Sequence, residues 1–114
     1  MFYRLYIFKL LIHTAPSAAP TNVNVYAMNH TAITVQWETV PCIEQNGDIT
    51  NYTVTVLESG EMERVEDVDG NVNEVIISGL TQSTTYSIQV AAVNSQGTGP
   101  YSDIVVINTP DSEL

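Results

Sequence analysis

The chain has 114 residues, and 44% of them are hydrophobic, which suits one domain with a buried apolar core and argues against disorder. Its three basic and thirteen acidic residues give a formal net charge of -10. All thirteen acids and only one base, Arg64, lie from Pro16 onward. This part of the chain would repel nucleic acid and anionic membrane surfaces, whereas basic partners remain compatible with it.

The first thirteen residues, MFYRLYIFKLLIH, hold two cations and no acids. They are too short for a transmembrane helix, which needs about 20 apolar residues. Two interpretations of residues 1–15 remain open. They are a signal peptide, which Lys9 inside the apolar run fits badly, or a truncated or mis-joined upstream segment. The proline-bearing residues 15–20 then predict a linker or a lead-in to a strand.

Alternation of apolar and polar residues with a period of two predicts β-strands along most of the chain. The predicted strands are residues 23–27, 32–38, 52–58, 74–80, 86–94 and 102–109, with a short edge strand around 62–65. Turn sequences separate them: QNGD, ESGE, VDGN and a longer loop, SQGTGP, at 95–100. About seven short strands without a helix-period stretch predict an all-β antiparallel sandwich. We expect one domain over residues 16–110 and a tail at 111–114.

Neither a metal site nor a catalytic site is expected. The single cysteine, Cys42, cannot form an internal disulfide, so we interpret it as a partly buried side chain, with a bridge to another chain or to a missing segment as the alternative. Asp67, Asp69 and Asn71 have the spacing of the first ligands of a calcium loop, but Val72 stands where the glycine belongs. We therefore interpret this stretch as a polar turn. The sequence also contains neither a recognisable arrangement of catalytic residues nor a phosphate-binding loop, so we expect no enzyme activity and no cofactor.

Two Asn-x-Thr triplets, at residues 29–31 and 51–53, are candidate sites of N-glycosylation in a secreted protein. Asn29 should lie in the turn between the first two strands. Asn51 should point outward, because its neighbour Tyr52 is predicted to point inward.

The sequence resembles a fibronectin type III domain from about residue 16 to 110. The resemblance is carried by ITVQW, NGDITNYTV, ISGLTQSTTYSIQVAAVN and GTGPYSD. It implies a seven-stranded antiparallel immunoglobulin-like β-sandwich with Trp37 and Tyr52 in the core. It also implies that the hydroxyl of Tyr86 bonds back to the backbone of the preceding turn, with Leu80 filling the core below it. All four residues would be structural.

The resemblance implies no active site, and NSQGTGP, at the position of an adhesive Arg-Gly-Asp loop in this family, has no arginine. In this topology three loops meet at one acidic end of the domain. We interpret that end as the candidate partner surface, with the residues Glu44, Asp48, Asp67, Asp69 and Tyr101.

Our leading hypothesis is a non-catalytic module of a multidomain adhesion or receptor protein, extracellular or at the cell surface. It would act as a spacer between neighbouring fibronectin type III domains and as a surface for a protein partner. We expect this domain neither to bind nucleic acid nor to insert into a membrane. The alternatives are an accessory domain of a larger secreted enzyme and an intracellular scaffold repeat.

Overall fold

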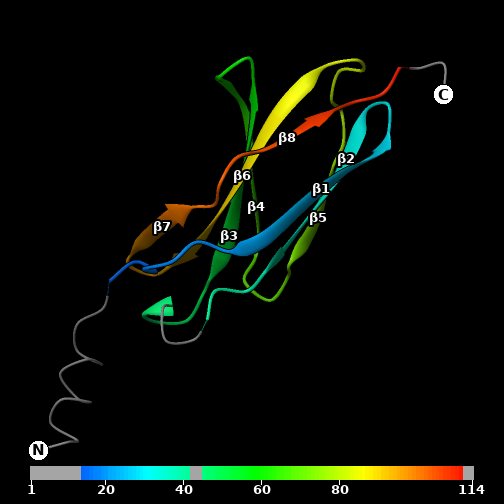
Figure 1. Cartoon of the computed structure of the whole chain (residues 1–114). Coiled ribbons are helices and arrows are strands. Elements are labelled where there is room, and N and C mark those ends of the chain that lie inside the picture. Colours follow the sequence, from blue (N-terminus) through cyan, green and yellow to red (C-terminus); the bar gives the residue numbers. More distant parts are fainter. Residues whose placement is uncertain (1–13, 42–44, 112–114) are drawn as a thin grey trace, which may run out of the picture.

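The structure, a computed structural model, describes residues 14–41 and 45–111. The strands are β1 (Thr21–Asn29), β2 (Ala32–Glu38), β3 (Asn51–Glu58), β4 (Glu61–Asp69), β5 (Glu74–Ile77), β6 (Thr85–Asn94), β7 (Gly97–Tyr101) and β8 (Val105–Asn108). They form a three-stranded sheet, β1-β2-β5, and a five-stranded sheet, β4-β3-β6-β7, in which β8 also pairs with β6. All pairs are antiparallel, and Figure 1 shows the two sheets as two layers. The predicted antiparallel sandwich is confirmed.

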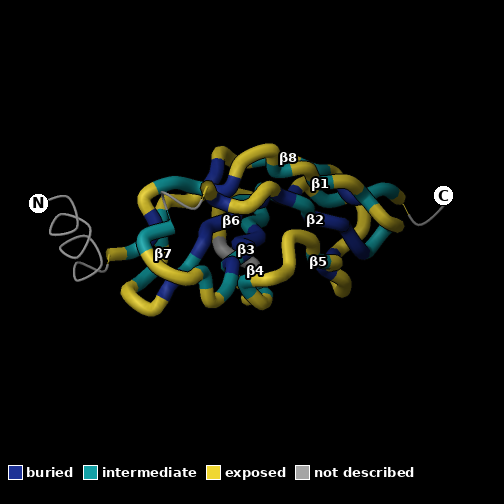
Figure 2. Tube along the Cα trace, turned by 90° about the horizontal axis from the view of Figure 1, so that it is seen from below, coloured by how far each residue is buried: buried dark blue, intermediate teal, exposed yellow. Residues whose placement is uncertain are grey.

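The core lies between the sheets and is built from alternate residues of the three central strands, β2, β3 and β6. Its buried members on these strands are Ile33, Val35, Trp37, Tyr52, Val54, Val56, Tyr86, Ile88, Val90 and Ala92. Figure 2 shows how burial differs between the strands: segments along β2 and β6 are buried, whereas those along β1 and β8 are exposed or half-buried. Each large aliphatic or aromatic side chain buried in this way stabilises the fold by about 1.5–3 kcal/mol.

Two details of the predicted strands were wrong: eight strands are present among the described residues, not seven, and the edge strand β4 is longer than expected. The segment assigned to a loop, residues 95–100, contains most of β7, which pairs with β6 from Ala91↔Tyr101 to Asn94↔Gly97. The glycine and proline residues of this segment predicted a loop instead of a strand. Pro100 is tolerated in β7 because β7 is an edge strand. The edge strand predicted at 62–65 spans nine residues because it pairs with the whole length of β3.

One close backbone approach at the end of β4 requires a glycine. A Cβ atom on Gly70 would lie 2.2 Å from the carbonyl oxygen of Ile49. The approach is fixed by hydrogen bonds, since the N–H of Gly70 donates to the carbonyl of Thr50 at 3.1 Å. The turn after β4 is thereby fastened to the segment that leads into β3.

Candidate interaction surfaces

The turn before β6 is held by the buried side chain of Tyr86. Its hydroxyl accepts a hydrogen bond from the backbone N–H of Thr81 at 2.8 Å. Leu80 is buried beside it, and its N–H donates to the carbonyl of Thr31 at 2.9 Å. This corner joins the β5–β6 connection to the turn between β1 and β2, so its polar atoms serve the fold rather than a ligand.

Trp37 and Tyr52 form an aromatic pair in the core, with ring centroids 5.3 Å apart and planes tilted by 55°. Both residues are buried. Burial raises the pKa of the Tyr52 hydroxyl, while the nearby Thr39 side chain and Val40 backbone oppose the rise. Neither of these contacts is a well-aligned hydrogen bond, so this hydroxyl has no such partner among the described residues.

The two buried tyrosines allow a matched test of the Tyr86 corner. Tyr86→Phe is expected to lower the free energy of unfolding by about 1–2 kcal/mol, because it leaves the N–H of Thr81 without its acceptor. Tyr52→Phe, which removes an unbonded hydroxyl, should change it by less than about 0.5 kcal/mol. Urea unfolding, followed by the fluorescence of the single tryptophan, measures both. Equal effects of the two variants would contradict this assignment.

Asn94, at the end of β6, connects three segments of one end of the domain. It is buried, and its Nδ2 donates to the backbone carbonyls of Thr14 at 2.7 Å, Gln45 at 3.0 Å and Asn46 at 3.3 Å. Its Oδ1 accepts from the N–H of Gln96 at 2.9 Å. The sequence analysis missed this role, although a signal was present. Position 94 continues the inward-facing series of β6, where a polar residue needs internal hydrogen bonds.

Two buried hydroxyls that the sequence analysis did not single out anchor the other edge of the five-stranded sheet. The Oγ of Ser102 accepts from the N–H of Val90 at 3.0 Å, at the break between β7 and β8. The Oγ1 of Thr109 donates to the carbonyl of Thr81 at 2.7 Å and accepts from the N–H of Thr84 at 3.0 Å. The Thr109 contacts hold the end of the last strand to the turn before β6, and the Ser102 contact holds the break between β7 and β8 to β6 itself.

The predicted partner residues do not form one cluster. Asp67 and Tyr101 lie in the same cross-strand row on the outer face of the five-stranded sheet, with Thr53 and Ala91 between them. The row crosses three strand spacings, about 14 Å, so the two residues lie at opposite edges of the sheet. Asp69 lies two residues further along β4, Asp48 is exposed in the loop before β3, and Glu44 lies outside the described residues.

The two candidate partner residues on β4, Asp67 and Asp69, are engaged in local hydrogen bonds. The Oδ1 of Asp67 accepts from the hydroxyl of Thr53 at 2.8 Å and from the Nδ2 of Asn51 at 3.4 Å. The Oδ1 of Asp69 accepts from the N–H of Asn71 at 3.2 Å, which is a turn contact. Within residues 14–41 and 45–111, no group of three or more His, Cys, Asp or Glu side chains could hold a metal ion.

Both candidate glycosylation asparagines reach the surface. Asn29 ends β1 and is exposed, and its Oδ1 accepts from the N–H of Thr31 at 2.9 Å and from its hydroxyl at 3.4 Å. Asn51 begins β3 and is half-buried on the outer face of the sheet, where Thr53 also lies. Cys42 and residues 1–13 lie outside the described part. Within that part, no helix is long and apolar enough to cross a membrane.

Comparison with known proteins identifies the domain. The sequence profile of the fibronectin type III domain matches residues 18–108. The chain belongs to this family. It is 34% identical over 99 residues to the human netrin receptor DCC, in a match that covers 87% of this chain and 7% of the receptor. It is 40% identical over 100 residues to the receptor-type tyrosine-protein phosphatase F of Bos taurus, covering 82% of this chain and 5% of that protein.

A solved structure agrees with these matches. The fibronectin type III domain of human contactin 1 superposes with a TM-score of 0.74 at 30% identity, and the match covers 87% of this chain and 85% of that one. The fibronectin type III domain described here therefore spans less than a tenth of the curated receptors that it matches. It is homologous to fibronectin type III modules of receptors, a structural type of domain that is generally non-catalytic.

Proposed function

We propose that this fibronectin type III domain is a non-catalytic module of a multidomain receptor or adhesion protein, extracellular or at the cell surface. It would act as a spacer between neighbouring domains of the same type and as a surface for a protein partner. The observation that carries the proposal is the 34% identity, over 87% of the chain, to part of a netrin receptor. The buried polar side chains described above support it, because they serve the fold and form no catalytic arrangement.

The path of the chain supports the role of a spacer. The described segment enters at one end of the sandwich and leaves at the other, as Figure 1 shows. At the entry, Asn94 and Asn46 hold the carbonyls of Thr14 and Ala15. At the exit, the N–H of Ser83 donates to the carbonyl of Pro110 at 3.2 Å. Both ends are thus fastened to the sandwich, so a neighbouring domain attached at either end would have a defined direction.

Glycosylation tests the proposed location. Expressed as residues 1–114 in a secreting eukaryotic cell line, the protein is expected in the medium with sugar that an N-glycan-removing enzyme releases, as measured by intact mass. Thr31→Ala should abolish the glycan on Asn29, whereas Thr31→Ser, which keeps the triplet, should retain it. Thr53→Ala and Thr53→Ser form the same pair for Asn51. Protein retained inside the cell without sugar would show that residues 1–15 are not a working signal peptide, and the extracellular location would then rest on the family relationship alone.

A further inference from the structure

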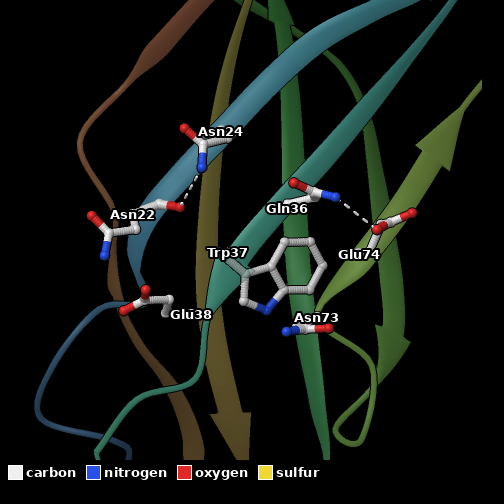
Figure 3. A pocket seen from close by; sticks show the side chains of 7 residues that line it. All are labelled: Asn22, Asn24, Gln36, Trp37, Glu38, Asn73 and Glu74. Atoms are coloured by element: carbon white, nitrogen blue, oxygen red, sulfur yellow. Dashed lines mark hydrogen bonds between the residues drawn. The ribbon is translucent and has the colours of Figure 1, made fainter.

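A polar pocket of about 290 Å³ lies on the three-stranded sheet, near the point where β5 begins. Figure 3 shows the amides and carboxylates that surround it: Asn22, Asn24, Gln36, Asn73, Glu38 and Glu74. Asn24, Gln36 and Glu74 form one cross-strand row from β1 through β2 to β5. The row lies on the outer face, because its neighbouring row, Val25, Val35 and Val75, packs against the core.

Trp37 also lines this pocket, although its indole packs inward against Tyr52. Its Nε1–H is buried, points toward Asn73 in Figure 3, and has no hydrogen-bond partner among the described residues. An unpaired buried donor is unfavourable, since it has lost its water without gaining an acceptor. A bound molecule that brings an oxygen acceptor to this point would satisfy it.

The charge of the pocket is negative and is not neutralised from within the described part of the chain. Glu74 accepts a hydrogen bond from the Nε2 of Gln36 at 2.8 Å, which is a neutral partner. Glu38 is exposed, and no ion pair forms at either carboxylate among the described residues. Arg64, the single cation of those residues, lies on β4 of the other sheet, 3.5 Å from Glu66. The pocket is therefore complementary to a cation supplied from outside.

An apolar row borders this polar row on the same face. Tyr26, Thr34 and Ile76 lie in register across β1, β2 and β5, two residues along each strand from the row of Asn24, Gln36 and Glu74. Tyr26 is 48% exposed and Ile76 is 51% exposed, and Met28 beyond them on β1 is 55% exposed. Exposed apolar side chains that gather on one face mark interaction sites. The two rows are about 7 Å apart, which is the spacing of alternate residues in an extended peptide.

We propose that this face docks a protein partner that places an arginine or lysine side chain in the pocket between Glu38 and Glu74. An apolar side chain two residues away in an extended segment of the partner would lie against Tyr26 and Ile76, and a backbone carbonyl would accept from the Trp37 indole. Charge complementarity favours such a partner over a second copy of this chain, whose identical face would bring like charges together. The proposal rests on the proposed protein-binding function, but it uses a different sheet from the acids of β4.

The test is a titration of the full ¹⁵N-labelled chain with a blocked pentapeptide of sequence LSRSL, followed by NMR. The chain has one tryptophan, so its indole N–H signal reports on the pocket directly. This signal and the Gln36 amide signals are expected to shift and saturate. The double variant Glu38→Gln and Glu74→Gln should bind about tenfold more weakly, since the negative charge of the pocket that attracts the cation is lost. The peptide LSESL should produce no shift.

The matched control is the double variant Asp67→Asn and Asp69→Asn, which removes the same charge from the other sheet and should leave the affinity unchanged. If both double variants weakened peptide binding equally, the effect would come from the net charge of the protein and not from this pocket, which would overturn the proposal. Absence of binding, equal binding of LSESL, or an indole signal that shifts on protein dilution alone would overturn it as well. In each case, normal secretion and glycosylation would leave the proposed function standing.

Discussion

Replacing Gly70 with alanine is expected to lower the free energy of unfolding by about 3 kcal/mol or more, at the upper end of what overpacking costs. The added Cβ would lie 2.2 Å from the carbonyl oxygen and 2.9 Å from the carbonyl carbon of Ile49. Neither the backbone at Gly70 nor the backbone at Ile49 can move away freely. The N–H of Gly70 is bonded to Thr50, whose own N–H donates to the carbonyl of Val93 at 2.8 Å. Relieving the clash would break the hydrogen bonds at the start of β3.

Urea unfolding measures this loss, and Gly60→Ala is the control. Gly60 lies in the tight turn between β3 and β4 with a φ of 81°, and an added Cβ would meet no atom within 4 Å. Its replacement should cost about 1 kcal/mol, which is the strain of a positive φ alone. If Gly70→Ala cost no more than Gly60→Ala, the close approach to Ile49 would not exist in solution.

Asn94→Ala is expected to lower the free energy of unfolding by about 2–4 kcal/mol, because the hydrogen bonds of one buried side chain to three segments are lost together. The carbonyls of Thr14, Gln45 and Asn46 lose a donor, and the N–H of Gln96 loses its acceptor. The entry segment is then no longer tied to the two loops. Limited proteolysis should cut the variant faster than the parent protein near residues 14–16, in addition to the shift in urea midpoint.

Two comparisons separate the hydrogen bonds of Asn94 from the size of its side chain. Asn94→Asp keeps the shape but places an acceptor against three carbonyl oxygens, so it should destabilise at least as much as alanine. Asn108→Ala removes an exposed asparagine of β8 and should change stability by less than about 0.5 kcal/mol. A tolerated Asn94→Asp would show that donation by Nδ2 does not hold this end together.

Local sequence patterns predicted most of the strands because burial of one face leaves a period of two. The runs at 32–38 and 86–94 coincide with β2 and nearly with β6, and both carry large inward side chains. β7 was not predicted, since glycine and proline dominate it and its pairing with β6 depends on a partner distant in the chain. The length of β4 was missed for a similar reason, because pairing with β3 extends it.

The candidate surfaces likewise combine features that the sequence predicts with features that depend on the tertiary structure. The sequence shows which residues are acidic, but it does not give the distances between exposed residues. Asp67 and Tyr101 were therefore grouped, although they lie at opposite edges of one sheet. The pocket beside Trp37 was not predicted at all, because its polar row takes one residue from each of three strands. Which residues become neighbours across a sheet depends on register, and register is set by the packing of the whole strand.

The sequence by itself determined that this chain forms an antiparallel sandwich with Trp37, Tyr52 and Tyr86 at inward positions and a strongly acidic surface. Alternation, turn residues and net charge are local or additive properties, so they can be read without coordinates. Only the tertiary structure decided that Asn94 fastens the entry segment, that Gly70 permits a backbone contact, and that an apolar row borders an acidic pocket on one face. Those features depend on contacts between residues far apart in the chain, which exist only once the two sheets have packed together.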